Sequence, residues 1–132
     1  NSEQIVCGAG SDEIISLITL AFSGIGDEII YSEHGFLMYP ISANKVGANA
    51  IKAKEINLKT NIRAVLEEIT EKTKIIFIAN PNNPTGTYLT KKELLDLRKK
   101  LNKNILPSCT SVLLWCHSVS LESDSYLYRK IN

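Results

Sequence analysis

The sequence lacks any apolar run close to the roughly 20 residues that a membrane-spanning helix requires. Its first four residues carry no basic segment followed by an apolar stretch, so we expect no secretory signal peptide. A strong charge of either sign is also missing, because the formal net charge is only +1 at pH 7. We therefore expect a cytoplasmic protein whose partners include neither a membrane nor nucleic acid.

Cysteine is scarce, and its spacing excludes the common cysteine-based sites. Cys7, Cys109 and Cys116 form neither a CxxC pair nor an even framework, which favours free thiols in a reducing compartment over disulfides. Cys116 and His117 are adjacent, but no second ligand pair follows at the spacing of a zinc site. We therefore expect no metal.

Short apolar runs alternate with amphipathic stretches, which predicts βα units around a largely parallel sheet and an α/β fold. Asn61 and the Thr90–Glu93 pair are typical helix-capping residues. An unbroken apolar run at 74–79 is typical of a strand buried on both faces. The predicted helices cover 11–23, 36–45, 61–69 and 90–102, and the predicted strands cover 28–31, 48–53, 74–79 and a stretch that begins at 105.

The composition changes near residue 106. Residues 105–132 contain six of the twelve serines, two of the three cysteines and the only tryptophan, but only four charged residues. Their apolar residues follow neither helical nor strand periodicity, although a βα unit has begun just before them. We therefore divide the chain into a partial α/β domain at 1–106 and an atypical tail at 107–132.

A glycine-rich turn, Gly8-Ala9-Gly10-Ser11-Asp12-Glu13, opens the first predicted helix. Free backbone amides and the positive end of the helix dipole favour an anion at such a position, and the Ser11 hydroxyl adds a donor. The turn is compatible with a plain strand-to-helix connection, because the third glycine of the dinucleotide fingerprint is absent. It is also compatible with a small phosphate- or nucleotide-binding α/β module.

A second motif, Asn80-Pro81-Asn82-Asn83-Pro84-Thr85-Gly86, directly follows the strongest predicted strand. Two prolines and a glycine favour a tight turn at the carboxyl end of a parallel strand, where open α/β sheets bind ligands. Pro84 is a candidate for a cis peptide bond that would aim the Asn83 side chain at a fixed point. The alternative is a solvent loop rich in turn-forming residues, which explains the composition but not the order.

Together these two motifs and the stretch from Phe36 to Ala48 resemble the class I/II group of fold-type I aminotransferases, which depend on pyridoxal phosphate. The resemblance covers residues 5–106 and is strongest toward the histidinol-phosphate aminotransferase branch. It implies part of a three-layer large domain with a mostly parallel sheet. It also implies a homodimer that transfers an amino group between histidinol phosphate, or a similar amino acid, and 2-oxoglutarate in histidine biosynthesis.

The resemblance assigns five residues to the cofactor. Gly10, Ser11 and Asp12 match the turn that holds its phosphate, and Phe36 matches the aromatic ring that stacks on its pyridine ring. Asn83 matches the asparagine that donates to its 3-oxygen. Tyr39 lies nearby, and we interpret it as a packing residue.

Other parts of the family's site have no match in this sequence. An aspartate that pairs with the pyridine nitrogen is expected in an Asp-x-x-Tyr stretch after the Thr90 helix, where Pro107 to Val112 stand instead. The lysine that forms the Schiff base is expected in a Ser-Lys motif, which does not occur. We interpret the chain as an aminotransferase fragment, inactive alone, whose tail arises from a frameshift after Leu106. A non-catalytic remnant of a degraded gene and a related decarboxylase stay open as alternatives.

Overall fold

The computed structural model describes residues 7–110, with side chains described through Ser108. Their main feature is a four-stranded sheet in the order β2-β1-β5-β6, in which all pairs are parallel. A small antiparallel pair, β3 with β4, lies outside it. The elements are α1 (Ser11–Phe22), β1 (Glu28–Ser32), α2 (Met38–Lys45), β2 (Asn49–Ala53), β3 (Glu55–Ile56), β4 (Lys59–Thr60), α3 (Ile62–Glu67), β5 (Thr73–Ala79), α4 (Lys91–Lys100) and β6 (Leu106–Thr110).

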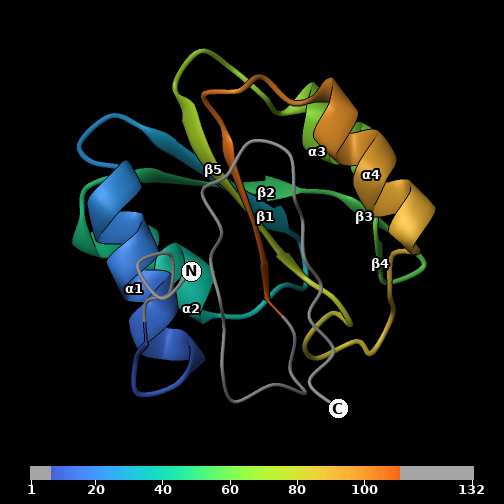
Figure 1. Cartoon of the computed structure of the whole chain (residues 1–132), viewed down its shortest axis with the longest axis horizontal. Coiled ribbons are helices and arrows are strands. Elements are labelled where there is room, and N and C mark those ends of the chain that lie inside the picture. Colours follow the sequence, from blue (N-terminus) through green and yellow to red (C-terminus); the bar gives the residue numbers. More distant parts are fainter. Residues whose placement is uncertain (1–6, 111–132) are drawn as a thin grey trace.

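Helices cover both faces of the sheet, with α1 and α2 on one side and α3 and α4 on the other (Figure 1). Successive residues of a strand point to opposite faces, so the buried side chains of β1 and β5 divide between two cores. Ile29, Ile75 and Phe77 belong to the core under α1 and α2. Ile30 and Ile76 belong to the core under α3 and α4. The predicted α/β fold and the two-sided burial of the 74–79 strand are confirmed.

The helix ends follow local signals, with small differences from prediction. Thr90 and Glu93 form the predicted capping box of α4, and the Asn61 side chain accepts from the amide of Arg63 at the start of α3. However, α3 ends at Glu67 rather than at residue 69, because the Ile69 amide donates to a carbonyl only three residues back, at 3.4 Å. The second helix begins at residue 38, and α4 ends at residue 100.

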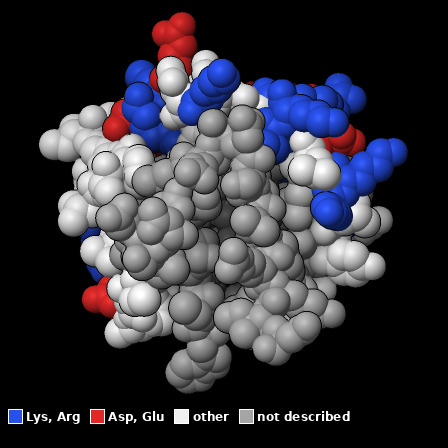
Figure 2. All heavy atoms as spheres, in the orientation of Figure 1, with Lys and Arg blue, Asp and Glu red and all other residues white. Residues whose placement is uncertain are grey.

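Basic side chains gather over the region of α4 (Figure 2). The last turn of that helix carries Arg98, Lys99 and Lys100, which favourably face the negative end of its dipole. In the first turn, Glu93 lies 2.7 Å from the ammonium of Lys59. The hydrogen bond from Lys59, helped by those from Thr90, lowers the pKa of the Glu93 carboxyl to about 2.

The sheet order creates a topological switch point between β1 and β5. The chain leaves β1 through α2 toward β2, and it leaves β5 through α4 toward β6, which lies on the opposite side. In open parallel sheets, the two diverging connections leave a crevice at the carboxyl ends of the central strands, and ligands bind there. The segment after β1 and the loop after β5 therefore flank the position where a ligand is expected.

The last described strand extends past the predicted boundary at residue 106. β6 pairs with β5 from Leu106 opposite Ile75 to Thr110 opposite Ala79, and Pro107 lies opposite Ile76. Proline lacks an amide hydrogen and is tolerated at a sheet edge, which is where β6 lies among the described strands. The rest of the predicted tail, residues 111–132, lies outside the described residues. No helix within 7–110 has the length and apolarity needed to cross a membrane.

Candidate functional site

The N-terminus of α1 presents an open helix end. Gly10 precedes the helix with φ of 93°, which favours glycine, and no heavy atom lies within 4 Å of the position of an added Cβ. Within the described part of the chain, no side chain caps this end. The first helical bond runs from the Ile14 amide to the Gly10 carbonyl, which leaves the earlier amides of Ser11 and Asp12 without helical acceptors. The predicted turn is therefore able to donate to an anion.

Two acidic side chains flank this end, but neither blocks the amides. Glu13 turns back and accepts from the amide of Ala9, outside the helix. The Ser11 hydroxyl donates to the Asp12 carboxylate at 3.3 Å. Gly8 is required by close packing here, because an added Cβ would lie 2.8 Å from Cδ1 of Ile14. The turn is thus held by Gly8 and Glu13, while the Ser11 and Asp12 amides stay available.

Phe36 lies in the segment between β1 and α2, and its ring is half-buried. It meets the Tyr39 ring edge-on, with centroids 6.0 Å apart and an interplanar angle of 89°. Tyr39 is 1% exposed and stacks on Phe77 at 4.7 Å, so the interpretation of Tyr39 as a packing residue is confirmed. Burial also raises the pKa of the Tyr31 phenol, which lies 6.3 Å from Tyr39. Phe36 is the member of this aromatic group that remains partly exposed.

The loop from Asn80 to Gly86 is held by its own hydrogen bonds. The Asn80 amide group exchanges two bonds with the Leu89 backbone, at 3.0 and 2.8 Å. The backbone of Asn82 accepts from Gly86 at 2.8 Å and donates to the Thr87 carbonyl at 2.7 Å. These bonds close the loop on itself and fix its position beyond the end of β5.

Both prolines of this loop follow cis peptide bonds. The cis bond predicted at Pro84 is confirmed, and a second at Pro81 was not predicted, although the same Asn-Pro pair precedes it. Asn83 is half-buried, and its side chain has no hydrogen bond to residues 7–110. Its amide group is therefore free to donate to a ligand.

These residues share one edge of the sheet. Phe36 follows the carboxyl end of β1, and Asn83 follows that of β5. Only a tight turn joins α1 to the start of β1, so the helix runs antiparallel to the strands and begins at the edge where they end. Figure 1 shows the start of α1 and the end of β5 on the same, lower side. The fold thus directs the uncapped start of α1, an aromatic ring and an unpaired amide toward one region.

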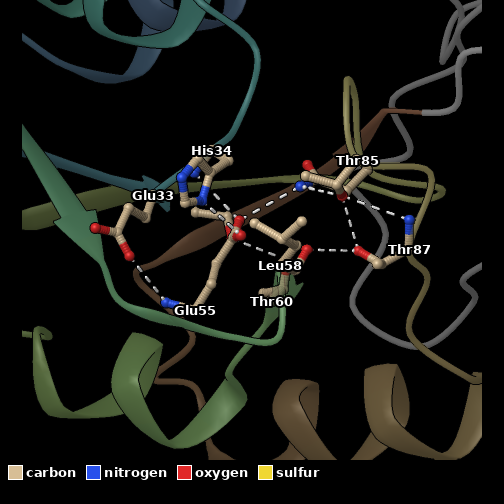
Figure 3. Close-up of polar contacts among 9 residues, drawn as sticks. Glu33, His34, Glu55, Leu58, Thr60, Thr85 and Thr87 are labelled. Atoms are coloured by element: carbon tan, nitrogen blue, oxygen red, sulfur yellow. Dashed lines mark hydrogen bonds and ion pairs between the residues drawn. The ribbon is translucent and has the colours of Figure 1, made fainter.

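A buried carboxylate at the same edge was missed by the sequence analysis. Glu55 is the first residue of β3, one residue beyond the end of β2, and its side chain is only 2% exposed. It accepts from the last residue of β1, from His34 just beyond that strand (Figure 3) and from the asparagine loop. A single glutamate after a short strand carries no motif, so no signal in the sequence marks it. Among residues 7–110, no group of three histidine, cysteine or acidic side chains is placed to hold a metal.

This layout defines a three-layer α/β domain with a topological switch point between β1 and β5. The chain belongs to the class I and II aminotransferases, because the model of that family matches residues 1–109. Pyridoxal phosphate is the cofactor of that family. The match ends within β6, whose five residues include no aspartate to pair with a pyridine nitrogen.

The similar proteins of known sequence point to one branch. A histidinol-phosphate aminotransferase of Pelagibacter ubique is 58% identical over 104 residues, which are 79% of this chain and 29% of that protein. One of Paramagnetospirillum magneticum is 50% identical over 106 residues, 80% of this chain and 29% of that protein. The chain therefore spans under a third of the length of these curated relatives.

Solved structures share the fold. Histidinol-phosphate aminotransferase from Sinorhizobium meliloti, in complex with pyridoxal-5'-phosphate, superimposes with a TM-score of 0.76 at 17% identity. The overlap covers 80% of this chain and 29% of that one. Alanine aminotransferase from Pyrococcus furiosus gives a TM-score of 0.73 at 27% identity, over 83% of this chain and 28% of that one. The predicted family and fold are both confirmed.

Proposed function

We propose that this chain supplies one side of the pyridoxal phosphate pocket of an aminotransferase that acts on histidinol phosphate. The observation that carries the proposal is the convergence of three unlike groups at the β1/β5 switch point. They are the open start of α1, the half-buried ring of Phe36 and the unpaired amide of Asn83. The free amides at the start of α1 suit the phosphate of the cofactor. The Phe36 ring suits its flat pyridine ring, and the Asn83 amide suits the oxygen on that ring.

Each group has a separate task toward the cofactor. The amides of Ser11 and Asp12 donate to the phosphate, and the dipole of the 12-residue helix α1 adds a favourable potential there. Phe36 packs against one face of the pyridine ring, and its edge-on contact with Tyr39 keeps its orientation. Asn83 donates to the 3-oxygen and stabilises its anionic form. When bound, the cofactor supplies a ring that accepts electron density from the α-carbon of the amino acid.

The choice of histidinol phosphate and 2-oxoglutarate as substrates is supported by the relatives at 58% and 50% identity. We infer that the residues described do not complete a catalytic site, because β6 carries no aspartate and the sequence has no Ser-Lys motif. Binding without turnover is therefore the expected property of the 132-residue chain. A homodimer and a cytoplasmic location belong to the same proposal.

A non-catalytic remnant is the second candidate, and the changed composition of residues 107–132 favours it. One experiment separates the two. Pyridoxal phosphate is titrated into the purified chain, the imine absorption is recorded, and borohydride is added before mass spectrometry of tryptic peptides. We expect reversible binding with no single lysine permanently modified.

A permanent adduct on one lysine contradicts binding without turnover, because it identifies a working Schiff-base residue. If the chain is folded and monodisperse but does not bind pyridoxal phosphate, the proposed cofactor site is contradicted and the non-catalytic remnant is supported. Pyridoxal is the matched control ligand, because it retains the aldehyde and lacks the phosphate that we propose α1 binds.

A further inference from the structure

The structure contains a polar cluster that joins the carboxyl ends of three strands. Its centre is Glu55, the first residue of β3, and His34 lies beside it just after β1 (Figure 3). Its other members are Ser32, the last residue of β1, and Asn82, in the loop after β5. We call these four residues the Glu55 cluster. Neither the phosphate turn nor the asparagine motif includes Glu55.

The carboxylate of Glu55 accepts four hydrogen bonds. Its Oε1 accepts from the Ser32 hydroxyl and from the His34 backbone amide at 3.2 Å. The same oxygen accepts from Nδ2 of Asn82 at 3.4 Å. Its Oε2 lies 3.0 Å from Nδ1 of His34, which therefore carries the proton in this contact. A carboxylate with a 2% exposed side chain is costly to bury unless such donors surround it.

Two of the residues that contact Glu55, His34 and Asn82, lie close in sequence to Phe36 and Asn83, which we propose to bind the cofactor. His34 is two positions before Phe36, with only Gly35 between them. That glycine is tightly held, because an added Cβ would lie 2.8 Å from the Ser32 carbonyl. Asn82 directly precedes Asn83. A shift of either contact is therefore transmitted through very few rotatable bonds to Phe36 or Asn83.

Glu55 also fixes the orientation of the Asn82 amide. Nδ2 of Asn82 donates to Glu55 and to the Thr85 hydroxyl at 3.0 Å, while its Oδ1 is buried without a partner. That orientation is retained because the carboxylate requires a donor and would repel the amide oxygen. Without the carboxylate, the amide is free to turn and give Oδ1 the Thr85 hydroxyl as a donor.

We propose that Glu55 is a positioning residue that holds the asparagine loop against the segment after β1, and so fixes Asn83 relative to Phe36. The link to the cofactor rests on the proposed function, but the link between the two segments does not. Hydrogen bonds, rather than charge, carry this role. A glutamine at position 55 retains Oε1 for three donors, and its amide nitrogen is able to donate to Nδ1 of the other His34 tautomer.

The test compares Glu55→Met with Glu55→Gln in the full chain, by amide hydrogen exchange followed by NMR. The reporters are the loop amides of Asn82 and Gly86, which donate to the carbonyls of Thr87 and Asn82. The Ile76 amide in β5 reports general loss of stability. We expect both loop amides to exchange at least about tenfold faster relative to Ile76 in Glu55→Met, and within about twofold of the parent in Glu55→Gln.

The control is Glu33→Met, because the exposed Glu33 carboxylate accepts only a 3.4 Å bond from the Glu55 amide. It should leave the loop amides unchanged. The proposal is overturned if amide exchange in Glu55→Met accelerates equally at Ile76 and in the loop. It is also overturned if the loop amides exchange as fast in Glu55→Gln as in Glu55→Met. If Glu55→Met fails to fold, Asn82→Ala breaks the same contact from the loop, and an unchanged Gly86 amide then refutes the idea.

Pyridoxal phosphate affinity forms the second arm and separates the two proposals. We expect Glu55→Met to bind the cofactor at least about fivefold more weakly and Glu55→Gln to bind like the parent. A parent chain that does not bind contradicts the proposed function, while the exchange data still decide whether Glu55 holds the loop. A loop that opens with no change in affinity refutes the link from Glu55 to the cofactor.

Discussion

Ser11→Pro tests whether the start of α1 holds the cofactor phosphate. Ser11 is the first residue of the helix, a position whose amide makes no helical bond and where proline is well tolerated. Gly10 has ψ of −178°, so the backbone before the ring is extended, as a residue before proline requires. The substitution therefore removes an amide hydrogen and a hydroxyl from the proposed phosphate site at little cost to the fold.

The expected loss follows from the charge on the ligand. A hydrogen bond to a charged group contributes about 1.5–3 kcal/mol, so the missing amide alone should weaken binding roughly 10- to 150-fold. Ser11→Ala removes only the hydroxyl and separates the two contributions. Lys91→Pro is the matched control, because Lys91 is the first residue of α4 and follows Thr90 in an extended conformation with ψ of 160°.

The assay measures the dissociation constants of pyridoxal phosphate and of pyridoxal by absorption titration. Ser11→Pro should weaken the binding of pyridoxal phosphate but not that of pyridoxal, and Lys91→Pro should change the affinity for neither ligand. Unchanged affinity for pyridoxal phosphate refutes the assignment of the phosphate to α1. An equal loss for both ligands also refutes it, because a damaged pocket would then explain the effect.

Three further predictions concern the fold, its acid stability and the gene. Ile76→Ala should lower the free energy of unfolding in urea by about 2–4 kcal/mol, against less than about 0.5 kcal/mol for Ile25→Ala, because Ile76 is fully buried and Ile25 is 93% exposed. The pKa of Glu93 is about 2 in the folded chain, so its stabilising effect is complete above the ordinary value of 4.5 and is lost as the pH falls toward 2. Glu93→Gln and Lys59→Met should each flatten that part of the stability profile, and a profile as steep as the parent's contradicts the ion pair. If a frameshift follows Leu106, another reading frame downstream should encode an Asp-x-x-Tyr strand, and its absence from the nucleotide sequence ends that explanation.

Features that depend on neighbouring residues were predictable from the sequence. The apolar run of β5 and the capping residues Asn61 and Thr90 carry their physical cause within a few positions. The loop that contains Asn83 could be placed at the carboxyl end of a parallel strand, where open α/β sheets bind ligands. Phe36 had no such local signal and was singled out by the family resemblance. Their assignment to a cofactor came from the family resemblance and stays a prediction.

The Glu55 cluster was not predictable, because its contacts join residues that the register of three strands brings together. Glu55 and Asn82 are far apart in the sequence, and only the placement of β1 between β2 and β5 brings their side chains within 3.4 Å. The early end of α3 has a similar origin. Its periodicity continues to Ile69, which still packs in the core although it lies outside the helix.

The strand order has a consequence for synthesis on the ribosome. β1 lies between β2 and β5, but the chain makes β5 last of the three. Until residues 73–79 have emerged, the backbone edge of β1 that faces β5 lacks its hydrogen-bond partner, and Ile29 and Ile30 lack Ile75 and Ile76 beside them. Long-range parallel pairing is slow to form, and unpaired strand edges are prone to aggregate. The nascent chain therefore exposes this edge to aggregation and to chaperone binding until β5 has been synthesised.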